Sequence, residues 1–150
     1  DRCSEMDVDV VSGMFMMVPR KVLEAVGPMD AAYFVYSEEA DWCRRIRNAG
    51  YRVVFTPLAR IIHRDGGSKS TFQIRPKMFV QLQKSQLIYS RKHNGFAGYL
   101  LVKLFYLGST AARLLVFGGT AIFRRTPRII GSAHLAWTAL KYHLFGQEPG

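Results

Sequence analysis

The chain has 150 residues, a formal net charge of +10 and 49% hydrophobic residues, so its length matches about one domain. Its two cysteines, Cys3 and Cys43, are too few for the disulfide framework of a small secreted protein. The composition therefore excludes a disulfide-stapled scaffold and indicates a reducing compartment, with Cys43 expected to be a buried thiol.

The charges are distributed unevenly along the chain. Nine of the eleven acidic residues lie at or before Asp41, whereas the segment 66–147 contains twelve Lys or Arg and no acid. This asymmetry indicates an anionic partner for the second part of the chain. We therefore predict a mixed α/β region over 1–70 and a helical, basic and apolar region over 71–150.

The first predicted elements are a strand and a short helix. The apolar run over 9–18 predicts a buried strand, with a close backbone approach at Gly13. A helix is expected over 20–26, ended by the left-handed residue Gly27.

A second helix and two short strands follow. The helix is predicted over 38–49, with Ser37 as its N-cap and Gly50 just after its end. Its core face is expected to carry Trp42, Ile46 and Ala49. Residues 52–56 and 60–63 are rich in β-branched or aromatic side chains, which predicts two strands.

The second region reads as a series of helices. One helix is predicted over 76–94 and is stopped by Gly95. The apolar segment 96–123 follows, with Gly118-Gly119 as a candidate kink or break. A last helix begins at Pro127. Its apolar stripe consists of Ile130, Ala133, Trp137, Leu140 and Leu144.

Three carboxylates in the first turn of the 38–49 helix, Glu38, Glu39 and Asp41, are the candidate catalytic residues. The helix N-terminus favours their ionised form, and an ionised carboxylate can accept a proton from an attacking hydroxyl. Adjacent helical residues project about 100° apart, so we expect Glu38 and Glu39 to face different spots. Asp41 precedes Arg45 by four residues, which predicts an ion pair. The alternative is that these acids only stabilise a helix N-terminus.

His63 follows the second predicted strand and precedes a glycine-containing loop. A histidine in this position can ligate a metal or contact a phosphate, although a purely structural histidine is the alternative. A hard Mg²⁺ or Mn²⁺ ion shared with carboxylates and a diphosphate fits the neighbouring residues better than zinc.

These residues together resemble one family. The resemblance rests on Ser12-Gly13-x-Phe15-Met16-x-Val18, Arg20-x-Val22, Val26-Gly27-x-Met29-Asp30, Phe34-x-Tyr36-x-Glu38-Glu39-x-Asp41-x-Cys43-x-Arg45-x-Arg47-x-Ala49-Gly50-Tyr51-Arg52-Val53, Pro57-x-Ala59, Ile62-His63 and Gly66-Gly67-Ser68. Over about residues 10–70 this pattern is similar to the family 2 glycosyltransferases, and within them to the rhamnosyltransferase-like group.

The resemblance implies the C-terminal half of a GT-A fold, a Rossmann-like α/β domain that uses a nucleotide-sugar donor with Mg²⁺ or Mn²⁺. The matching positions make Glu39 the base, with Glu38 as the alternative, and make His63 the metal or diphosphate contact. Trp42 stands where the family usually has leucine, which we interpret as core variation. The family's nucleotide-binding half, with its Asp-x-Asp metal motif, is not in this sequence; Asp7-Val8-Asp9 stands at the wrong place for it. A chain without that half is expected to bind the nucleotide poorly and to be inactive alone.

The implied reaction is inverting sugar transfer to a hydroxyl of a lipid-linked glycan acceptor, in cell-surface polysaccharide synthesis. The basic tail favours helices on or partly in the cytoplasmic leaflet of a bacterial inner membrane, in contact with anionic lipid. Lys103 and Arg113 argue against a simple transmembrane span over 96–123.

Three alternatives to membrane association or to catalysis stay open. The tail can instead be an amphipathic hairpin packed on the domain or on another subunit. The chain can also be a non-catalytic membrane- or partner-binding fragment. A sequence pI of about 10.0 permits nucleic-acid binding, but the basic residues are interleaved with aliphatic runs, and no nucleic acid is expected as partner.

Overall fold

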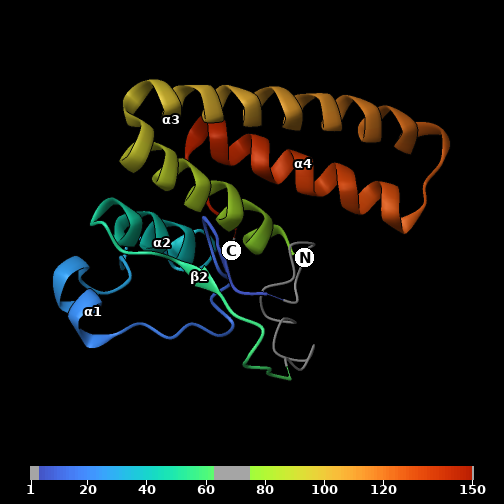
Figure 1. Cartoon of the computed structure of the whole chain (residues 1–150). Coiled ribbons are helices and arrows are strands. Elements are labelled where there is room, and N and C mark those ends of the chain that lie inside the picture. The colour runs from blue at the N-terminus through green and yellow to red at the C-terminus, as the bar shows by residue number, and fades with distance from the viewer. Residues whose placement is uncertain (1–3, 63–74, 150) are drawn as a thin grey trace. The chain divides into compact units, whose positions relative to one another are not determined.

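The computed structural model of the chain describes residues 4–62 and 75–149. The chain divides into two compact units, Asp1–Gly67 and Ser68–Gly150. The order of elements is β1, α1, α2 and β2 in the first unit, followed by α3 and α4 in the second (Figure 1).

The first unit combines two short helices with a two-stranded antiparallel sheet. Strand β1 (Met6–Asp7) pairs with β2 (Val54–Phe55), with Met6 opposite Phe55 and Asp7 opposite Val54. Helix α1 spans Arg20–Val26 and α2 spans Glu38–Asn48. Both helices lie where the sequence predicts them.

Glycines end both helices, as predicted. Gly27 has φ +73° and Gly50 has φ +84°, a left-handed backbone that a residue without Cβ adopts at little cost. The N–H of Gly27 donates to the carbonyl of Leu23 at 2.8 Å.

The core of the first unit is small and lies between the two helices and the chain near β2. It consists of Val22, Cys43, Ile46 and Val53. Cys43 is a fully buried free thiol, as the sequence predicts. The predicted core face of α2 is partly wrong, because Ala49 is exposed and Trp42 is only half-buried. The core stripe instead passes through Cys43 and Ile46.

The strand predictions are less accurate. Residues 9–18 form no strand, and several of their large side chains are exposed. A strand needs a neighbour for its hydrogen-bond ladder, and in the described residues β2 takes β1 as its partner. The predicted strand 52–56 is reduced to Val54–Phe55. The described part of 60–63, Arg60–Ile62, is not a strand.

The second unit consists of two helices. Helix α3 spans Pro76–Phe123 and bends at Gly95 (φ 69°, ψ −163°), so that its two parts run back beside α4 (Figure 1). The predicted stop at Gly95 is therefore a sharp bend. At Gly118-Gly119 the helix continues without a break. Helix α4 begins at Pro127, as predicted, and ends at Phe145.

A small polar cluster joins the two parts of α3 to α4. Nε2 of His143 on α4 donates to Oε1 of Gln83 at 2.6 Å, and the His143 ring stacks on Tyr106 at 5.5 Å between centroids. The hydroxyl of Tyr106 donates to Gln86. The residues of α4 that are buried are Ala136, Thr138, Ala139 and His143. Of its predicted apolar stripe, Ile130, Trp137 and Leu144 are exposed.

Candidate functional site

The head of α2 carries an unusual backbone. Tyr36 has φ 69° and Ser37 has φ 67°, although neither is a glycine and Cβ makes this conformation costly by about 1–2 kcal/mol per residue. Ser37 is the N-cap, as predicted, but its side chain makes no capping hydrogen bond. Two consecutive strained residues in front of a helix occur where the surrounding structure needs a particular geometry, and they are common at functional sites.

The two glutamates that follow this turn have buried oxygens. Oε2 of Glu38 and Oε2 of Glu39 are both shielded from solvent and have no hydrogen-bond partner among the described residues. Burial of a carboxylate oxygen is costly unless something compensates it. The helix N-terminus supplies part of that compensation through its partial positive charge.

The carboxyl groups of Glu38 and Glu39 also interact with each other. Burial raises the pKa of the Glu38 carboxyl, its own backbone N–H opposes this, and the charge of Glu39 and a side-chain hydrogen bond to it raise the pKa further. The expectation that adjacent residues face different spots is therefore wrong here. Glutamate side chains have three rotatable bonds, so the carboxyl groups converge although their Cβ atoms diverge. Tyr36 belongs to the same group of residues, because burial and the charge of Glu38 raise the pKa of its hydroxyl.

The loop that contains Gly13 lies beside Glu39. A Cβ placed on Gly13 would lie 3.8 Å from Cβ of Glu39 and 3.9 Å from its Cδ. The predicted close approach of backbone at Gly13 is thus made to Glu39. These distances are ordinary van der Waals contacts, so an alanine would also fit.

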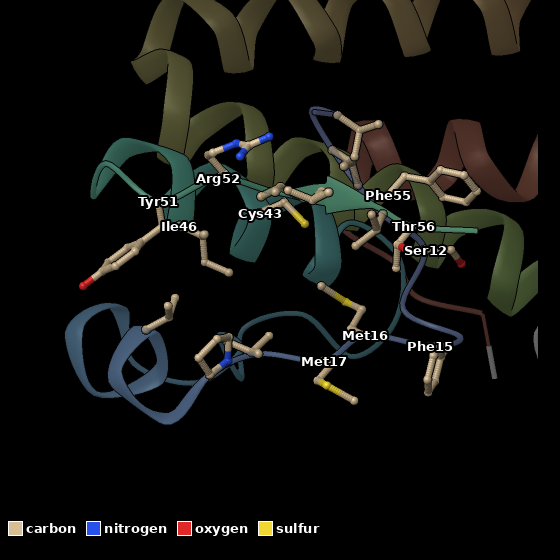
Figure 2. A pocket seen from close by; sticks show the side chains of 18 of the residues that line it. Ser12, Phe15, Met16, Met17, Cys43, Ile46, Tyr51, Arg52, Phe55 and Thr56 are labelled. Carbon is tan, nitrogen blue, oxygen red and sulfur yellow. The ribbon is translucent and has the colours of Figure 1, made fainter. Parts of the chain in front are cut away.

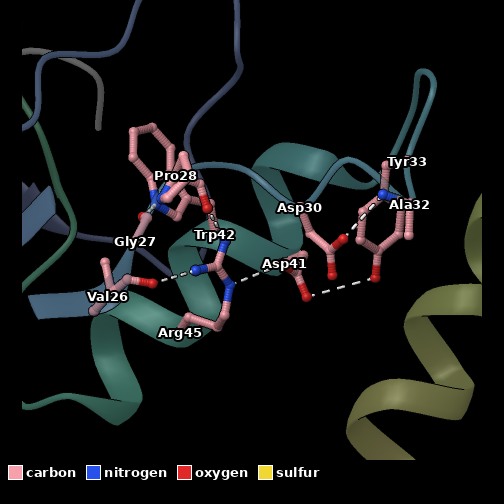
Figure 3. A network of polar contacts seen from close by, with 9 residues as sticks. All are labelled: Val26, Gly27, Pro28, Asp30, Ala32, Tyr33, Asp41, Trp42 and Arg45. Carbon is pink, nitrogen blue, oxygen red and sulfur yellow. Dashed lines mark hydrogen bonds and ion pairs between the residues drawn. The ribbon is translucent and has the colours of Figure 1, made fainter. Parts of the chain in front are cut away.

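A network of polar contacts fixes the turn before the glutamates to α2 (Figure 3). The Arg45 guanidinium donates to the carbonyls of Val26 at 2.5 Å and Pro28 at 2.7 Å. Nε1 of Trp42 donates to the carbonyl of Gly27, between them, at 2.9 Å. Two side chains of α2 therefore hold three successive carbonyls, and we call this arrangement, together with Asp41, the turn network.

Asp41 anchors the turn network from within. Its side chain is fully buried, and Oδ2 accepts from Nε of Arg45 at 2.9 Å, which confirms the predicted ion pair. The Tyr33 hydroxyl lies 3.5 Å from its other oxygen. These contacts suit a residue that positions the guanidinium, and a direct catalytic role for Asp41 stays a prediction.

Sequence reasoning missed three features of this site. Trp42 is more than core variation, because its indole N–H holds the turn. The carbonyl contacts of Arg45 join residues 17 and 19 positions apart, and helical spacing cannot reveal them. The left-handed Tyr36 and Ser37 carry no sequence signal, since neither is a residue type that favours that conformation.

A hollow of about 860 Å³ lies on the other side of the first unit (Figure 2). Apolar residues from the segment 8–18 form one wall, and Cys43, Ile46 and residues 51–56 form the other. The side chains of Met16, Met17 and Phe15 lie along the wall formed by 8–18 (Figure 2). Because few polar groups line this hollow, the reactive groups of the unit are those at the head of α2.

The metal prediction rests on a residue that the structure does not describe. His63 lies outside the described residues. Among residues 4–62 and 75–149, no group of three His, Cys, Asp or Glu side chains is arranged to hold a metal ion. The described residues therefore do not themselves form a donor set for Mg²⁺ or Mn²⁺.

Comparison with curated proteins finds a local similarity to rhamnosyltransferases. Over 60 residues, 40% of this chain, it is 37% identical to the N-acetylglucosaminyl-diphospho-decaprenol L-rhamnosyltransferase of Mycobacterium tuberculosis. It is equally identical over 60 residues to the rhamnosyltransferase WbbL of Escherichia coli. The matched segment spans 20% of the first relative and 23% of the second.

The similarity supports a glycosyltransferase-like relationship over this short region. No family model matches the chain, and no solved structure matches it. A GT-A fold and membership of family 2 accordingly stay predictions.

Proposed function

We propose that this chain carries the acceptor-activating part of an inverting glycosyltransferase. The enzyme would move a sugar from a nucleotide-sugar donor to a hydroxyl of a lipid-linked glycan, in the synthesis of a cell-surface polysaccharide. The local similarity to two rhamnosyltransferases supports sugar transfer, and the name of one relative includes a diphospho-decaprenol acceptor. The observation that carries the proposal is the pair of buried carboxylate oxygens, without hydrogen-bond partners among the described residues, at the head of α2.

In this proposal Glu39 is the general base. The acceptor hydroxyl gives its proton to the Glu39 carboxylate as its oxygen bonds to the anomeric carbon. The bond between that carbon and the diphosphate oxygen breaks on the opposite face, and the nucleoside diphosphate leaves. The helix N-terminus keeps the base ionised, while Glu38, whose pKa is raised, holds a proton more readily and donates a hydrogen bond to its neighbour.

The turn network positions this pair. Arg45 and Trp42 fix residues 26–28 against α2, so the backbone on both sides of residues 29–37 is held. The strained Tyr36 and Ser37 then have a defined frame in which to deliver the glutamates. A divalent metal would stabilise the leaving diphosphate, but the described residues do not supply its ligands, so the steps assigned here involve only the chain's own groups.

The test measures sugar transfer by the complete gene product that contains this chain. Glu39→Gln should lower turnover by about 10²-fold or more, because it removes the base, while donor binding stays largely intact. Glu24→Gln, which changes an exposed acid on α1, is the matched control and should have normal turnover. Normal turnover in both Glu39→Gln and Glu38→Gln would refute the assignment.

A further inference from the structure

The outer face of α3 after its bend is a continuous apolar surface. Its exposed side chains are Leu100, Leu101, Leu104, Phe105, Leu115, Val116, Ile122 and Phe123. At 100° per residue they fall within about 160° of the helix circumference. All other residues of that sector between positions 97 and 123 are alanine or glycine. We call this surface the apolar strip.

The apolar strip is exposed throughout its length. Leu101 is 69% exposed, Leu115 78% and Phe123 88%. An 18-residue window of α3 has a mean hydropathy of 1.6, and only 6% of that window is buried. Contiguous exposed apolar surfaces of this kind mark interaction sites with proteins or membranes.

Charge surrounds the strip without entering it. Exposed Arg91 and Lys92 precede it, and the turn after it carries Arg124, Arg125 and Arg128. Lys103 and Arg113, which argue against a transmembrane span, lie outside the strip's sector at 100° per residue. Residues 75–149 contain eleven Lys or Arg and one acid, Glu148. A partner must therefore accept a long apolar face and also carry negative charge.

We propose that the apolar strip lies flat on an anionic lipid bilayer. An apolar helix face with bases at its borders can enter the boundary between headgroups and acyl chains, while the bases contact anionic headgroups. The opposite face of α3 is occupied by contacts to α4 and contains the buried Thr110, so only one face is available to lipid. Spanning the bilayer would instead carry Lys103 and Arg113 into the hydrocarbon region, at a high cost.

The first experiment is co-sedimentation of the 150-residue chain with phosphatidylcholine vesicles that contain either no or 30 mol% phosphatidylglycerol (a chosen composition, about a third of the lipid, to supply negative charge). Leu101→Glu with Leu115→Glu should lower the partition coefficient at least about tenfold for each substitution, because each removes an apolar side chain from lipid. The matched control, Leu58→Glu with Ile62→Glu, makes the same chemical change at two residues of the first unit that are 86% and 92% exposed. It should retain binding apart from the modest effect of the added charge.

The arginines of the turn test the electrostatic half of the proposal. Arg124→Gln with Arg125→Gln should weaken binding to the anionic vesicles by roughly fivefold for each arginine and leave binding to neutral vesicles unchanged. Equal binding of the wild-type chain and the Leu101→Glu with Leu115→Glu variant would overturn the proposal. So would a wild-type dimer in solution that ignores vesicles and dissociates in that variant, since the strip would then be the interface with a second copy.

Depth measurements separate a flat helix from a spanning one. Single tryptophans replace Leu101, Leu115 or Phe123 in a background with Trp42→Phe and Trp137→Phe, and lipids brominated at different depths quench their emission. Residues 101 and 123 are about 33 Å apart along a helix. A flat helix gives the same depth for all three reporters, whereas depths that pass through the bilayer centre would refute the flat arrangement.

Discussion

The turn network makes a quantitative prediction about Arg45. Arg45→Met removes the guanidinium that binds Asp41 and the carbonyls of Val26 and Pro28. Loss of one partner from a buried ion pair costs about 3–5 kcal/mol. The Arg45 side chain is 21% exposed, whereas that of Asp41 is fully buried, so the cost should lie near the lower end, at about 3 kcal/mol.

The assay is urea unfolding in a Trp137→Phe background. Trp42 is then the remaining tryptophan, and it lies in the turn network, so its emission reports the first unit. The matched control is Arg47→Met on the same helix, whose partner Asp9 is 82% exposed. An exposed ion pair contributes about 0.2–1 kcal/mol, so the control should unfold almost as the background does.

A double-mutant cycle completes this test. Asp41→Leu with Arg45→Met removes both charges, and apolar replacement of a buried pair is often nearly neutral. The double variant should therefore be more stable than the sum of the single effects by at least about 2 kcal/mol. A cost below about 1 kcal/mol for Arg45→Met, or additive effects in the cycle, would refute the structural role given to this pair.

Two further predictions concern a buried histidine and the strained turn. Burial and the charge of Lys103 lower the pKa of His143 from 6.5 to about 4; the unfolded chain therefore binds a proton first, and the free energy of unfolding should fall by about 2–3 kcal/mol as the pH drops from 6.5 to 4. Urea titrations at several pH values should show this loss in the wild type and in a His134→Gln control, which changes an exposed histidine of α4, and not in His143→Gln. Ser37→Gly should stabilise the first unit by about 1 kcal/mol, because glycine relieves the left-handed strain, whereas Gly27→Ala should cost about 1–3 kcal/mol at φ +73°; thermal unfolding measures both, and equal signs would contradict the strain argument.

The helices of the first unit could be predicted from the sequence because their ends are marked locally. Gly27 and Gly50 supply left-handed residues where α1 and α2 stop, and Asp41 and Arg45 are placed for an ion pair at helical spacing. Such signals act within a few residues, so they need no knowledge of the rest of the fold.

Strands depend on partners that are distant in the sequence, and here the predictions failed. The run 9–18 has the composition of a strand, but in the described residues the ladder forms between Met6–Asp7 and Val54–Phe55. The preference of β-branched residues for strands reflects packing on a sheet that must already exist. Composition alone therefore predicted a strand in the apolar run and missed the short strand before it.

The bend of α3 shows how a single residue can change what a helix exposes. Gly95 has a φ of 69° and a ψ of −163°, which ends the regular hydrogen bonding, whereas Gly118-Gly119 stays helical because nothing there requires a left-handed backbone. Glycine permits a break but does not cause one. The segment 96–123 is consequently a straight run long enough to present one uninterrupted apolar face.

The position of Glu39 could have been deduced from helical spacing alone. Glu39 precedes Cys43 by four residues and Ile46 by seven, so the three share one face of α2, and Cys43 and Ile46 are buried. An acid at the head of an apolar stripe must have a buried oxygen, as Glu39 has. Asp41 and Arg45 lie on a different face, which holds the turn. The same helix thus separates a structural carboxylate, neutralised by a guanidinium, from one whose buried oxygen has no partner among the described residues, and only the second has the environment of a base.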